Sequence, residues 1–444
     1  MGKYFIKTYG CQMNKADSER IAFLLKSLGF EETKDREKAN LVIINMCSVR
    51  QSAVDRVYGL INELKKKKKK QIIFLTGCIL TEDKKKLEKK VEEILDIRKL
   101  ISWPKILKEY FPEIKETKFD FSLNDYLSLP PLRKNKFLAY LPIMNGCNNF
   151  CSYCVVPYTR GREKYRPAGE IIAEAKKIIK EEYKEIVLLG QNVNSWKGNN
   201  KKGPQTFPQL LEKIASLPGN FWLNFLTSHP KDMSNELIEV MAKSKKCVPY
   251  VHLPVQSGNN EILKKMKRNY TVEHYQKLIE KIRKNFKKYR QGLEKYPTIS
   301  TDIIVGFPGE TKKQFQDTIK LFKKIKFDMA YIARYSPRPG TTAFYLKDNI
   351  SLIEKKRREK ILTEILKKSA LENNKKYLNQ VIEVLVENQR PSRNKKTTFE
   401  YLGKTKSQKT VTFEAKEKNL IGKWIKIKIT QVNPWGLKGE IVKS

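Results

Sequence analysis

The stretch Gly146-Cys-Asn-Asn-Phe-Cys-Ser-Tyr-Cys154 places Cys147, Cys151 and Cys154 in the spacing Cys-x3-Cys-x2-Cys. The residues directly before it, 137–144, have the apolar pattern of a buried strand. Three thiolates this close along the chain can bind one face of a [4Fe–4S] cluster and leave its fourth iron open for a small molecule. A structural zinc site requires four ligands, usually as two separated pairs. No second pair lies nearby, so zinc is the weaker interpretation.

From this strand onward, predicted strands and helices alternate six times. The expected strands are 137–144, 185–190, 221–227, 250–255, 298–305 and 329–335, with helices over 167–182, 208–217, 232–244, 272–286 and 311–324. A long basic helix over 351–377 ends this region. Six such units predict an α/β fold in which a parallel sheet curves into part of a (β/α) barrel. Because such a barrel is open, its lateral gap suits a bulky substrate.

Polar residues follow several of the predicted barrel strands, at the end where barrels carry their functional groups. Gln191 and Asn192 follow one strand, and Gln256 follows another. The chain has three histidines, and none belongs to a recognisable catalytic triad. The glycine-rich segments do not match a Walker loop. The sequence therefore gives no support to a hydrolase or a P-loop enzyme.

Three further cysteines, Cys11, Cys47 and Cys78, each come directly after a predicted strand. These strands, 4–9, 41–45 and 71–76, alternate with helices over 18–27 and 52–64. In a parallel sheet the carboxyl ends of the strands lie along one edge, where ligands bind. We therefore expect the three cysteines to converge on a second cluster with one open iron. The alternative is that the three are unrelated buried cysteines. We interpret the seventh cysteine, Cys247, as a buried core residue of that kind.

The C-terminal part has five short predicted strands with basic connections, which are typical of a small β-barrel. The strands are 381–387, 398–402, 410–415, 424–430 and 437–442. The stretch 112–135 has weak periodicity and is expected to be a linker. The predicted organisation is an α/β domain over 1–115, a linker over 116–136, the partial barrel over 137–377 and the β-barrel over 378–444.

The 444 residues include 90 Lys and Arg against 48 Asp and Glu, a net charge of +42. This excess favours a polyanionic partner, either a nucleic acid or an anionic membrane surface, although biased genome composition could also produce it. The lysine run 65–70 is interpreted as a solvated helix end rather than a nucleic-acid contact. No apolar run approaches the ~20 residues that span a bilayer. No signal-peptide pattern follows the basic start. We expect a cytoplasmic protein without a membrane partner.

The cysteine motif after the first strand of a partial barrel is similar to that of the radical S-adenosylmethionine (SAM) superfamily. With the upstream cysteine domain and the terminal β-barrel, the chain resembles the tRNA methylthiotransferases of the MiaB type over nearly its whole length. The motifs that carry the resemblance are Thr8-Tyr-Gly-Cys-Gln-Met-Asn14, Asn45-Met-Cys-Ser-Val-Arg50, Thr76-Gly-Cys78, Gly146 through Arg162, His252-Leu-Pro-Val-Gln-Ser-Gly258, Thr301-Asp-Ile-Ile-Val-Gly-Phe-Pro-Gly-Glu-Thr311 and Tyr335-Ser-Pro-Arg-Pro-Gly-Thr341.

The resemblance implies that Cys147, Cys151 and Cys154 hold a [4Fe–4S] cluster that chelates SAM and cleaves it to a 5′-deoxyadenosyl radical. The radical would take hydrogen from C2 of N6-isopentenyladenosine beside the anticodon. It further implies that Cys11, Cys47 and Cys78 hold an auxiliary [4Fe–4S] cluster, with which the inserted sulfur is associated. An aromatic C–H bond has no useful acidity, so a cofactor must supply the reactivity while the protein positions and shields it. The terminal barrel would be a TRAM domain that grips tRNA.

The resemblance also suggests roles for individual side chains. Tyr153 would pack on the adenine of SAM, with plain core packing as an equal alternative. Gln191, Asn192 and Gln256 would hydrogen-bond SAM. Residues expected to meet RNA phosphate, if they are not simply solvated, are Arg160, Arg162 and Arg166. We expect a monomer and a one-electron donor such as flavodoxin or ferredoxin, while the sulfur donor is not indicated.

Two features depart from the family pattern. The segment 287–297 is longer than usual, which predicts an enlarged surface loop away from the chemistry. Lys404 stands where the family often has Arg, so that charge is kept but bidentate phosphate binding is lost.

Three rival functions stay open. One is methylthiolation of threonylcarbamoyladenosine in tRNA, and a second is modification of a ribosomal protein. The third is a zinc-dependent RNA-binding protein without catalysis.

Overall fold

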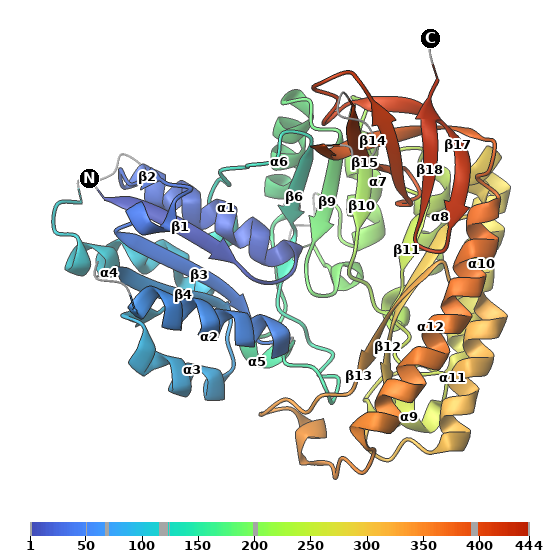
Figure 1. The fold of residues 1–444 in the computed structure, drawn as a ribbon, viewed down its shortest axis with the longest axis horizontal. Coiled ribbons are helices and arrows are strands. Elements are labelled where there is room, and N and C mark those ends of the chain that lie inside the picture. The colour runs from blue at the N-terminus through green and yellow to red at the C-terminus, as the bar shows by residue number, and fades with distance from the viewer. Residues whose placement is uncertain are drawn as a thin grey trace.

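The structure is a computed structural model that describes residues 2–49, 51–66, 71–114, 123, 125–198, 203–391 and 398–442. Figure 1 shows three units in chain order: an N-terminal α/β unit in blue, a partial barrel from teal to orange, and a C-terminal β-barrel in red. The lysine run predicted as a helix end follows the helix that ends at Lys65, and residues 67–70 lie outside the described part.

The N-terminal unit is a five-stranded parallel sheet in the order β2-β1-β3-β4-β5. Its strands are β1 Lys3–Thr8, β2 Glu31–Glu32, β3 Leu41–Cys47, β4 Ile72–Cys78 and β5 Glu93–Ile94. Its helices are α1 Gln12–Ser27, α2 Gln51–Lys65, α3 Thr81–Leu87 and α4 Trp103–Tyr110. Leu41 and Ile43 pack with α1 and α4, whereas Val42 and Ile44 pack with α2 and α3. Burial on both faces explains the β-branched run of β3.

The predicted linker is partly a core element. Residues Tyr126, Leu127 and Leu129 are buried in the core that α1 and α4 share, around the single turn η4 Tyr126–Ser128. The Leu127 carbonyl accepts hydrogen bonds from the buried guanidinium of Arg20 on α1. A single turn is too short to show helical periodicity, so nothing in the sequence indicated that part of the predicted linker is buried.

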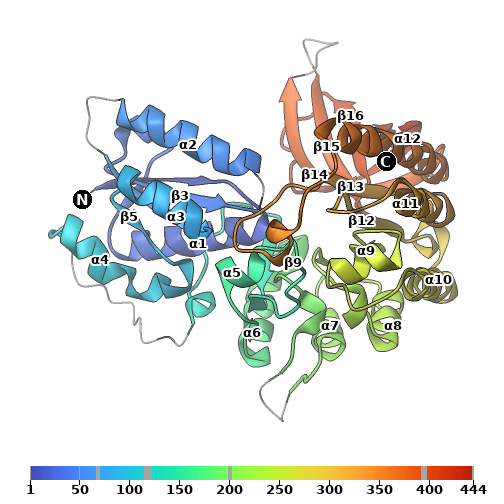
Figure 2. The ribbon, with the colours of Figure 1, turned by 90° about the horizontal axis from the view of Figure 1, so that it is seen from below.

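The partial barrel has the six expected strands: β6 Leu138–Pro142, β9 Glu185–Leu189, β10 Trp222–Phe225, β11 Tyr250–His252, β12 Thr298–Val305 and β13 Met329–Arg334. They form two three-stranded parallel sheets, β10-β9-β6 and β11-β12-β13, which a parallel bridge between Leu223 and Cys247 joins. Cys247 is buried in this core, as expected. Figure 2 shows the helices outside the strands: α6 Ala168–Lys180, α7 Phe207–Ala215, α8 Asn235–Lys243, α10 Val272–Tyr289, α11 Lys312–Ile325 and α12 Leu352–Lys375.

Short elements that the periodicity did not indicate lie in the loops after the strands. They are β7 Met144–Asn145, α5 Val156–Arg160, β8 Lys164–Tyr165 and α9 Asn260–Lys265. Conversely, α1 begins well before the predicted start at 18, because Cys11 is its N-cap residue. These loop elements shape the site at the carboxyl ends of the strands.

The C-terminal unit is a closed barrel in the order β14-β15-β16-β18-β17. Its strands are β14 Val381–Pro391, β15 Phe399–Thr405, β16 Thr410–Ala415, β17 Trp424–Asn433 and β18 Gly436–Ile441. The barrel docks at the amino-terminal ends of the partial-barrel strands. Nζ of Lys404 lies 2.6 Å from Oε2 of Glu185, the first residue of β9, and Nζ of Lys409 lies 2.6 Å from Oδ1 of Asp328. Lys404 is therefore an interdomain ion-pair partner, which corrects its interpretation as a phosphate contact.

The long segment 287–297 belongs to the same interface. It holds the last turn of α10 and the short turn η7 Gly292–Lys295. Oε1 of Glu294 pairs with Nζ of Lys406 at 2.9 Å, and Leu293 packs against the core of the terminal barrel. The segment is partly exposed, as the predicted surface loop would be, but it also binds the third unit, which the sequence did not indicate. No described helix is long and apolar enough to cross a bilayer.

Candidate iron–sulfur site

The contiguous cysteines lie on the loop that leaves the first barrel strand. Cys147 and Cys151 are buried and Cys154 is half-buried. Gly146 has φ +86°, and a Cβ there would lie 2.1 Å from the Arg162 carbonyl oxygen. The loop thus folds back tightly on residues 161–162, which only glycine permits. The amide of Gly146 donates to Oε1 of Gln191 at 2.5 Å, so a residue after β9 braces the loop.

The three thiols of this loop share one environment. Burial, with the neighbouring Cys151 and Cys147 thiols as smaller causes, raises the pKa of Cys154 to about 12. Burial also raises the pKa of Cys147. A bound metal reverses this preference, because a coordinating thiol is deprotonated. Three sulfur donors on one loop, two of them buried and one half-buried, fit a [4Fe–4S] cluster with one open iron.

The dispersed cysteines converge at the carboxyl edge of the N-terminal sheet. Cys47 and Cys78 are paired in register at the ends of β3 and β4. Their hydrogen bond lowers the pKa of the Cys47 thiol, and Cys11 interacts electrostatically with both. Gly77 has φ +108°, and a Cβ there would lie 2.3 Å from the Met46 carbonyl oxygen. Cys47 and Cys78 are buried while Cys11 is exposed, so this set also fits a cluster that is open on one side.

Neither set resembles a site for one metal ion. Within the described ranges, no three His, Cys, Asp or Glu side chains could hold a single ion.

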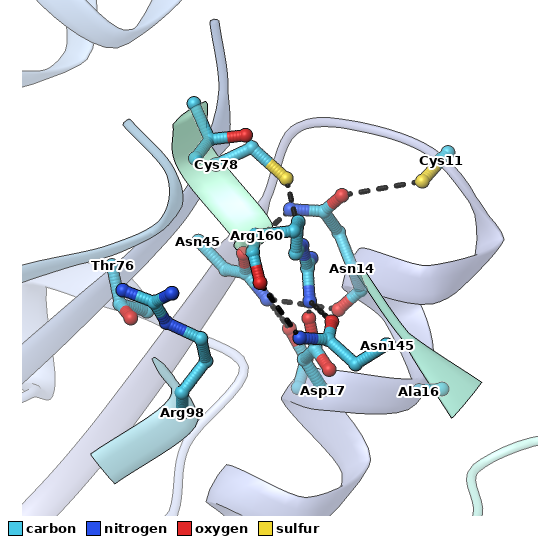
Figure 3. Close-up of polar contacts among 12 residues, drawn as sticks. Cys11, Asn14, Ala16, Asp17, Asn45, Thr76, Cys78, Arg98, Asn145 and Arg160 are labelled. Carbon is cyan, nitrogen blue, oxygen red and sulfur yellow. Dashed lines mark hydrogen bonds and ion pairs between the residues drawn. The ribbon is translucent and has the colours of Figure 1, made fainter. Parts of the chain in front are cut away.

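A buried arginine that follows the first cysteine set in the chain reaches the second set through Cys78 (Figure 3). Arg160 ends the short helix α5 after the contiguous cysteines, and its side chain is 1% exposed. Its Nη2 donates to Oδ2 of Asp17 at 2.7 Å, and its Nε donates to Sγ of Cys78 at 3.0 Å. The prediction that Arg160 meets RNA phosphate is therefore wrong, because its hydrogen bonds are directed into the N-terminal unit.

Arg166 is also buried, which corrects its predicted role. Its Nη1 donates to Oε2 of Glu174 at 2.7 Å and to the Pro142 carbonyl at 3.0 Å. Arg162 differs from both, since it is exposed and its guanidinium lies 4.3 Å from the ring centroid of Phe150. Of the three arginines proposed from the sequence, only Arg162 is available at the surface.

The four residues expected near SAM lie around the carboxyl ends of the barrel strands. Asn192 is buried and donates through Nδ2 to Oδ2 of Asp232 at 2.8 Å. Gln256 is buried with φ +71°, a conformation that costs energy for a residue with a side chain and recurs at functional sites. Tyr153 is half-buried and packs against the small core around Phe307. Gln191 holds the loop amide described above.

The sequence did not indicate the roles of two further residues of the site. His229, after β10, is buried, and its Nδ1 accepts a hydrogen bond from the Lys231 amide at 3.2 Å. Burial, followed by Arg268 and Lys231, lowers the pKa of His229 to about 2, so the ring is neutral with its proton on Nε2. That Nε2 and Oδ1 of Asn192 are buried atoms without a hydrogen-bond partner. A polar small molecule bound here would satisfy both.

The second missed residue is Arg268, whose Nη1 donates to Sγ of Cys151 at 3.4 Å. No motif or spacing indicates this contact. His229 belongs to the polar residues at the strand ends that outline a site in the sequence, but nothing in the sequence assigns it a ligand.

Comparisons with known families agree with this architecture. The profile of the radical SAM superfamily matches residues 141–322. The profile described as "Uncharacterized protein family UPF0004" matches residues 3–97, and that of the TRAM domain matches residues 375–442. Each profile falls on one of the three units.

Among solved structures, the cobalamin- and [4Fe–4S]-bound radical SAM methyltransferase TsrM from Kitasatospora setae aligns with a TM-score of 0.51 and 14% identity, over 78% of this chain and 77% of that one. The cobalamin-dependent radical SAM enzyme OxsB aligns with a TM-score of 0.51 and 10% identity, over 85% of this chain and 56% of that one. At such identities the likeness shows the fold alone.

Curated relatives are much closer. The tRNA-2-methylthio-N(6)-dimethylallyladenosine synthase of Clostridium botulinum (strain Hall) is 41% identical, over 99% of this chain and 97% of the relative. The protein with the same name from Buchnera aphidicola subsp. Baizongia pistaciae is 40% identical, over 99% of this chain and 98% of the relative. With full-length identity at this level, two converging cysteine sets and a terminal TRAM barrel, the chain belongs to the radical SAM tRNA methylthiotransferase family of tRNA-2-methylthio-N(6)-dimethylallyladenosine synthases.

Proposed function

We infer that this chain inserts a methylthio group at C2 of N6-isopentenyladenosine next to the anticodon of tRNA, giving 2-methylthio-N6-isopentenyladenosine. The observation that carries the inference is the pair of three-cysteine sets, one at the mouth of the partial barrel and one on the adjoining sheet edge, joined by Arg160. Full-length relatives of 40% identity or more carry this activity in their names.

The cysteines Cys147, Cys151 and Cys154 would hold the cluster that binds SAM. When bound, the cluster and SAM supply a one-electron cleavage that produces a radical able to take hydrogen from an unactivated C–H bond. The chain contributes position and shielding. The loop is locked by Gly146 and Gln191, so the three sulfurs are arranged before the cofactor arrives.

We propose that SAM contacts Tyr153, Gln191, Asn192 and Gln256, together with His229. The support for Asn192 and His229 is their unsatisfied buried atoms, one acceptor and one donor. Asn192 follows Gln191, which holds the cysteine loop, and His229 interacts with Arg268, which contacts Cys151. A SAM molecule has oxygen acceptors for the His229 Nε2–H group and hydroxyl or amino donors for the Asn192 oxygen. Binding there would remove the cost of leaving two polar atoms unpaired.

We further propose that Cys11, Cys47 and Cys78 hold a second [4Fe–4S] cluster, with which the inserted sulfur is associated. The support is their convergence at one sheet edge. A flavodoxin or ferredoxin would supply the electron. The proposal does not specify the sulfur donor. We also propose that the chain acts as a monomer in the cytoplasm, where tRNA takes part in translation.

The protein surface offers features suited to RNA. The net charge is +42, and Arg162 is exposed beside the cysteine loop. The segment after β13 runs toward the N-terminal unit (Figure 2), where Nη1 of Arg338 donates to Oε1 of Gln51 at 2.8 Å. In this segment the side chain of Tyr345 is 79% exposed. Exposed aromatic rings among cations are suited to stacking unpaired bases, so we propose that this segment and the terminal barrel both contact the tRNA.

The test uses the reconstituted protein under anaerobic conditions with SAM, a reductant and tRNA carrying N6-isopentenyladenosine. Digestion and mass spectrometry should reveal the 2-methylthio nucleoside. Parallel reactions with threonylcarbamoyl-modified tRNA and with ribosomal protein separate the rival substrates. Product on either rival alone would overturn the inference. A protein that binds zinc and cleaves no SAM would favour the non-catalytic alternative.

A further inference from the structure

Arg160 lies shortly after Cys154 in the chain, yet its side chain reaches the other cysteine set. We propose that Arg160 is a positioning residue of the second cluster: it orients Cys78 and raises the reduction potential of the cluster on Cys11, Cys47 and Cys78, with no corresponding effect on the cluster of its own loop. This inference rests on the second cluster of the proposed function.

The geometry leaves the guanidinium one orientation. Its Nη2 is held by Oδ2 of Asp17 at 2.7 Å, and its Nη1 lies 3.3 Å from Oδ1 of Asn145 and 3.4 Å from the hydroxyl of Tyr126. With these atoms fixed, the planar fork points Nε at Sγ of Cys78, 3.0 Å away (Figure 3). All the groups involved are buried.

Asn145 adds a link to the first cysteine loop. Its Nδ2 donates to the Arg160 carbonyl at 3.1 Å while its Oδ1 accepts from the Arg160 guanidinium. Asn145 lies directly before Gly146 and Cys147 in the chain. The loop that carries the first set therefore holds the residue that orients the second set.

The effect on reduction follows from charge. A reduced cluster carries one more negative charge, and N–H groups directed at its sulfurs stabilise that charge. A buried cation strengthens this effect, since screening by water is weak. Asp17 offsets part of the cation's charge but leaves the Nε–H···S hydrogen bond in place. Removing the hydrogen bond should make the second cluster harder to reduce.

Two other buried arginines provide matched controls. Arg268 donates to Sγ of Cys151 at 3.4 Å, in the first set, and is fixed through Nη2 by the Pro254 carbonyl at 2.7 Å. Arg166 is also buried, and among the described residues its side chain donates to oxygen atoms of Glu170, Pro142 and Glu174 rather than to a sulfur. Arg268 tests whether the effect follows the contacted sulfur, and Arg166 tests whether any buried arginine produces it.

The experiment isolates each cluster in the full-length chain. A Cys147→Ala, Cys151→Ala, Cys154→Ala background retains only the second set, and a Cys11→Ala, Cys47→Ala, Cys78→Ala background retains only the first. Arg160→Lys, Arg268→Lys and Arg166→Lys are placed in both, because lysine keeps the charge but loses the fork. Iron content and the midpoint potential, from dithionite titration monitored by electron paramagnetic resonance, are measured without RNA.

We expect Arg160→Lys to make reduction of the second cluster about tenfold less favourable, which lowers the midpoint potential by about 59 mV for one electron. Selective loss of the second cluster from this variant would also support the proposal. The first cluster should keep its potential. Arg268→Lys should act only on the first cluster and Arg166→Lys on neither. An unchanged second cluster, equal changes in both clusters, or an equal change in Arg166→Lys would overturn the proposal. Since no RNA product is measured, failure here is distinguishable from failure of the proposed substrate.

Discussion

The two cysteine sets differ in how the fold brings them together. Cys147, Cys151 and Cys154 lie on one loop, so their proximity is covalent and needs only a tight turn at Gly146. Cys11, Cys47 and Cys78 come from three separate strand ends, so their proximity depends on the register of β3 with β4 and on the start of α1. The local set should tolerate disturbance of the sheet, whereas the dispersed set should not.

The largest effects should come from the cysteines themselves. Replacing Cys151 by Ala removes one ligand of three from the SAM-binding cluster and should abolish both SAM cleavage and product. Replacing Cys78 by Ala should abolish product while some SAM cleavage continues. Each variant should lose about four of about eight irons. Assays of 5′-deoxyadenosine, methylthio nucleoside and iron check this, and methylthiolation retained by either variant would refute the assignment.

The glycine before each set sharpens the comparison. Gly77→Ala forces a positive φ on alanine, costs about 1–2 kcal/mol for the conformation alone, and meets the Met46 carbonyl of the neighbouring strand. We expect selective loss of the second cluster. Gly146→Ala meets the Arg162 carbonyl within its own loop and should reduce only the first cluster. Cluster-specific spectra of the two variants measure this, and loss of the same cluster in both would contradict it.

Asp17 tests the connection between the sets. Asp17→Ala leaves the Arg160 guanidinium buried without its carboxylate partner, which for a broken buried ion pair costs about 3–5 kcal/mol. Urea unfolding of the apoprotein should show this loss. The exposed pair of Arg36 and Glu63 is the control, and Glu63→Ala should change stability by no more than about 1 kcal/mol. Equal losses in the two variants would show that the buried connection is not specially stabilising.

The opposite end of the partial barrel should be separable from both sets. Lys404→Ala removes a cation from the buried Glu185 carboxylate, which keeps hydrogen bonds from Asn224 and Gln408. Both of these hydrogen bonds go to Oε1, so Oε2 is left buried without its cation and we expect a comparable loss, about 3–5 kcal/mol, with both clusters intact. Limited proteolysis should release the terminal barrel sooner than in the unmodified chain. A loss of iron in this variant would mean that the interface and the cysteine sites are coupled.

The smallest effect should come from the surface. Arg162→Ala should weaken tRNA binding and lower the slope of log affinity against log salt concentration by about 1, as expected for one phosphate contact. Arg36→Ala, on the N-terminal unit, is the surface control. Binding isotherms at several salt concentrations give both slopes. An unchanged slope in Arg162→Ala would remove Arg162 from the RNA contacts.

Much of this architecture could be predicted because it is encoded locally. The six barrel strands and the β-branched strand of residues 41–47 follow from short apolar patterns, and the spacing of Cys147, Cys151 and Cys154 identifies their chemistry. The convergence of the dispersed cysteines was also expected, since parallel strands end at one edge. The role of Arg160 was not predicted, because its partners Asp17 and Cys78 are far away along the chain.

The same distinction explains the contacts that the sequence did not indicate. Lys404 and the segment 287–297 have the composition of a solvated surface, yet both lie against another unit. The sequence shows that Lys404 is charged, but only the packing of the units decides whether it pairs with an RNA phosphate or with Glu185.

By itself, the sequence determined the three units, the two sets of three cysteines and the radical SAM character of the contiguous set. These depend on periodicity and on covalent spacing, which act over a few residues. The tertiary structure alone decided that Arg160 faces the second set, that Asn192 and His229 hold unsatisfied atoms, and that the terminal barrel closes the amino-terminal end. Those facts depend on contacts between residues that are far apart in the sequence, and such contacts are determined by the free energy of packing the whole chain.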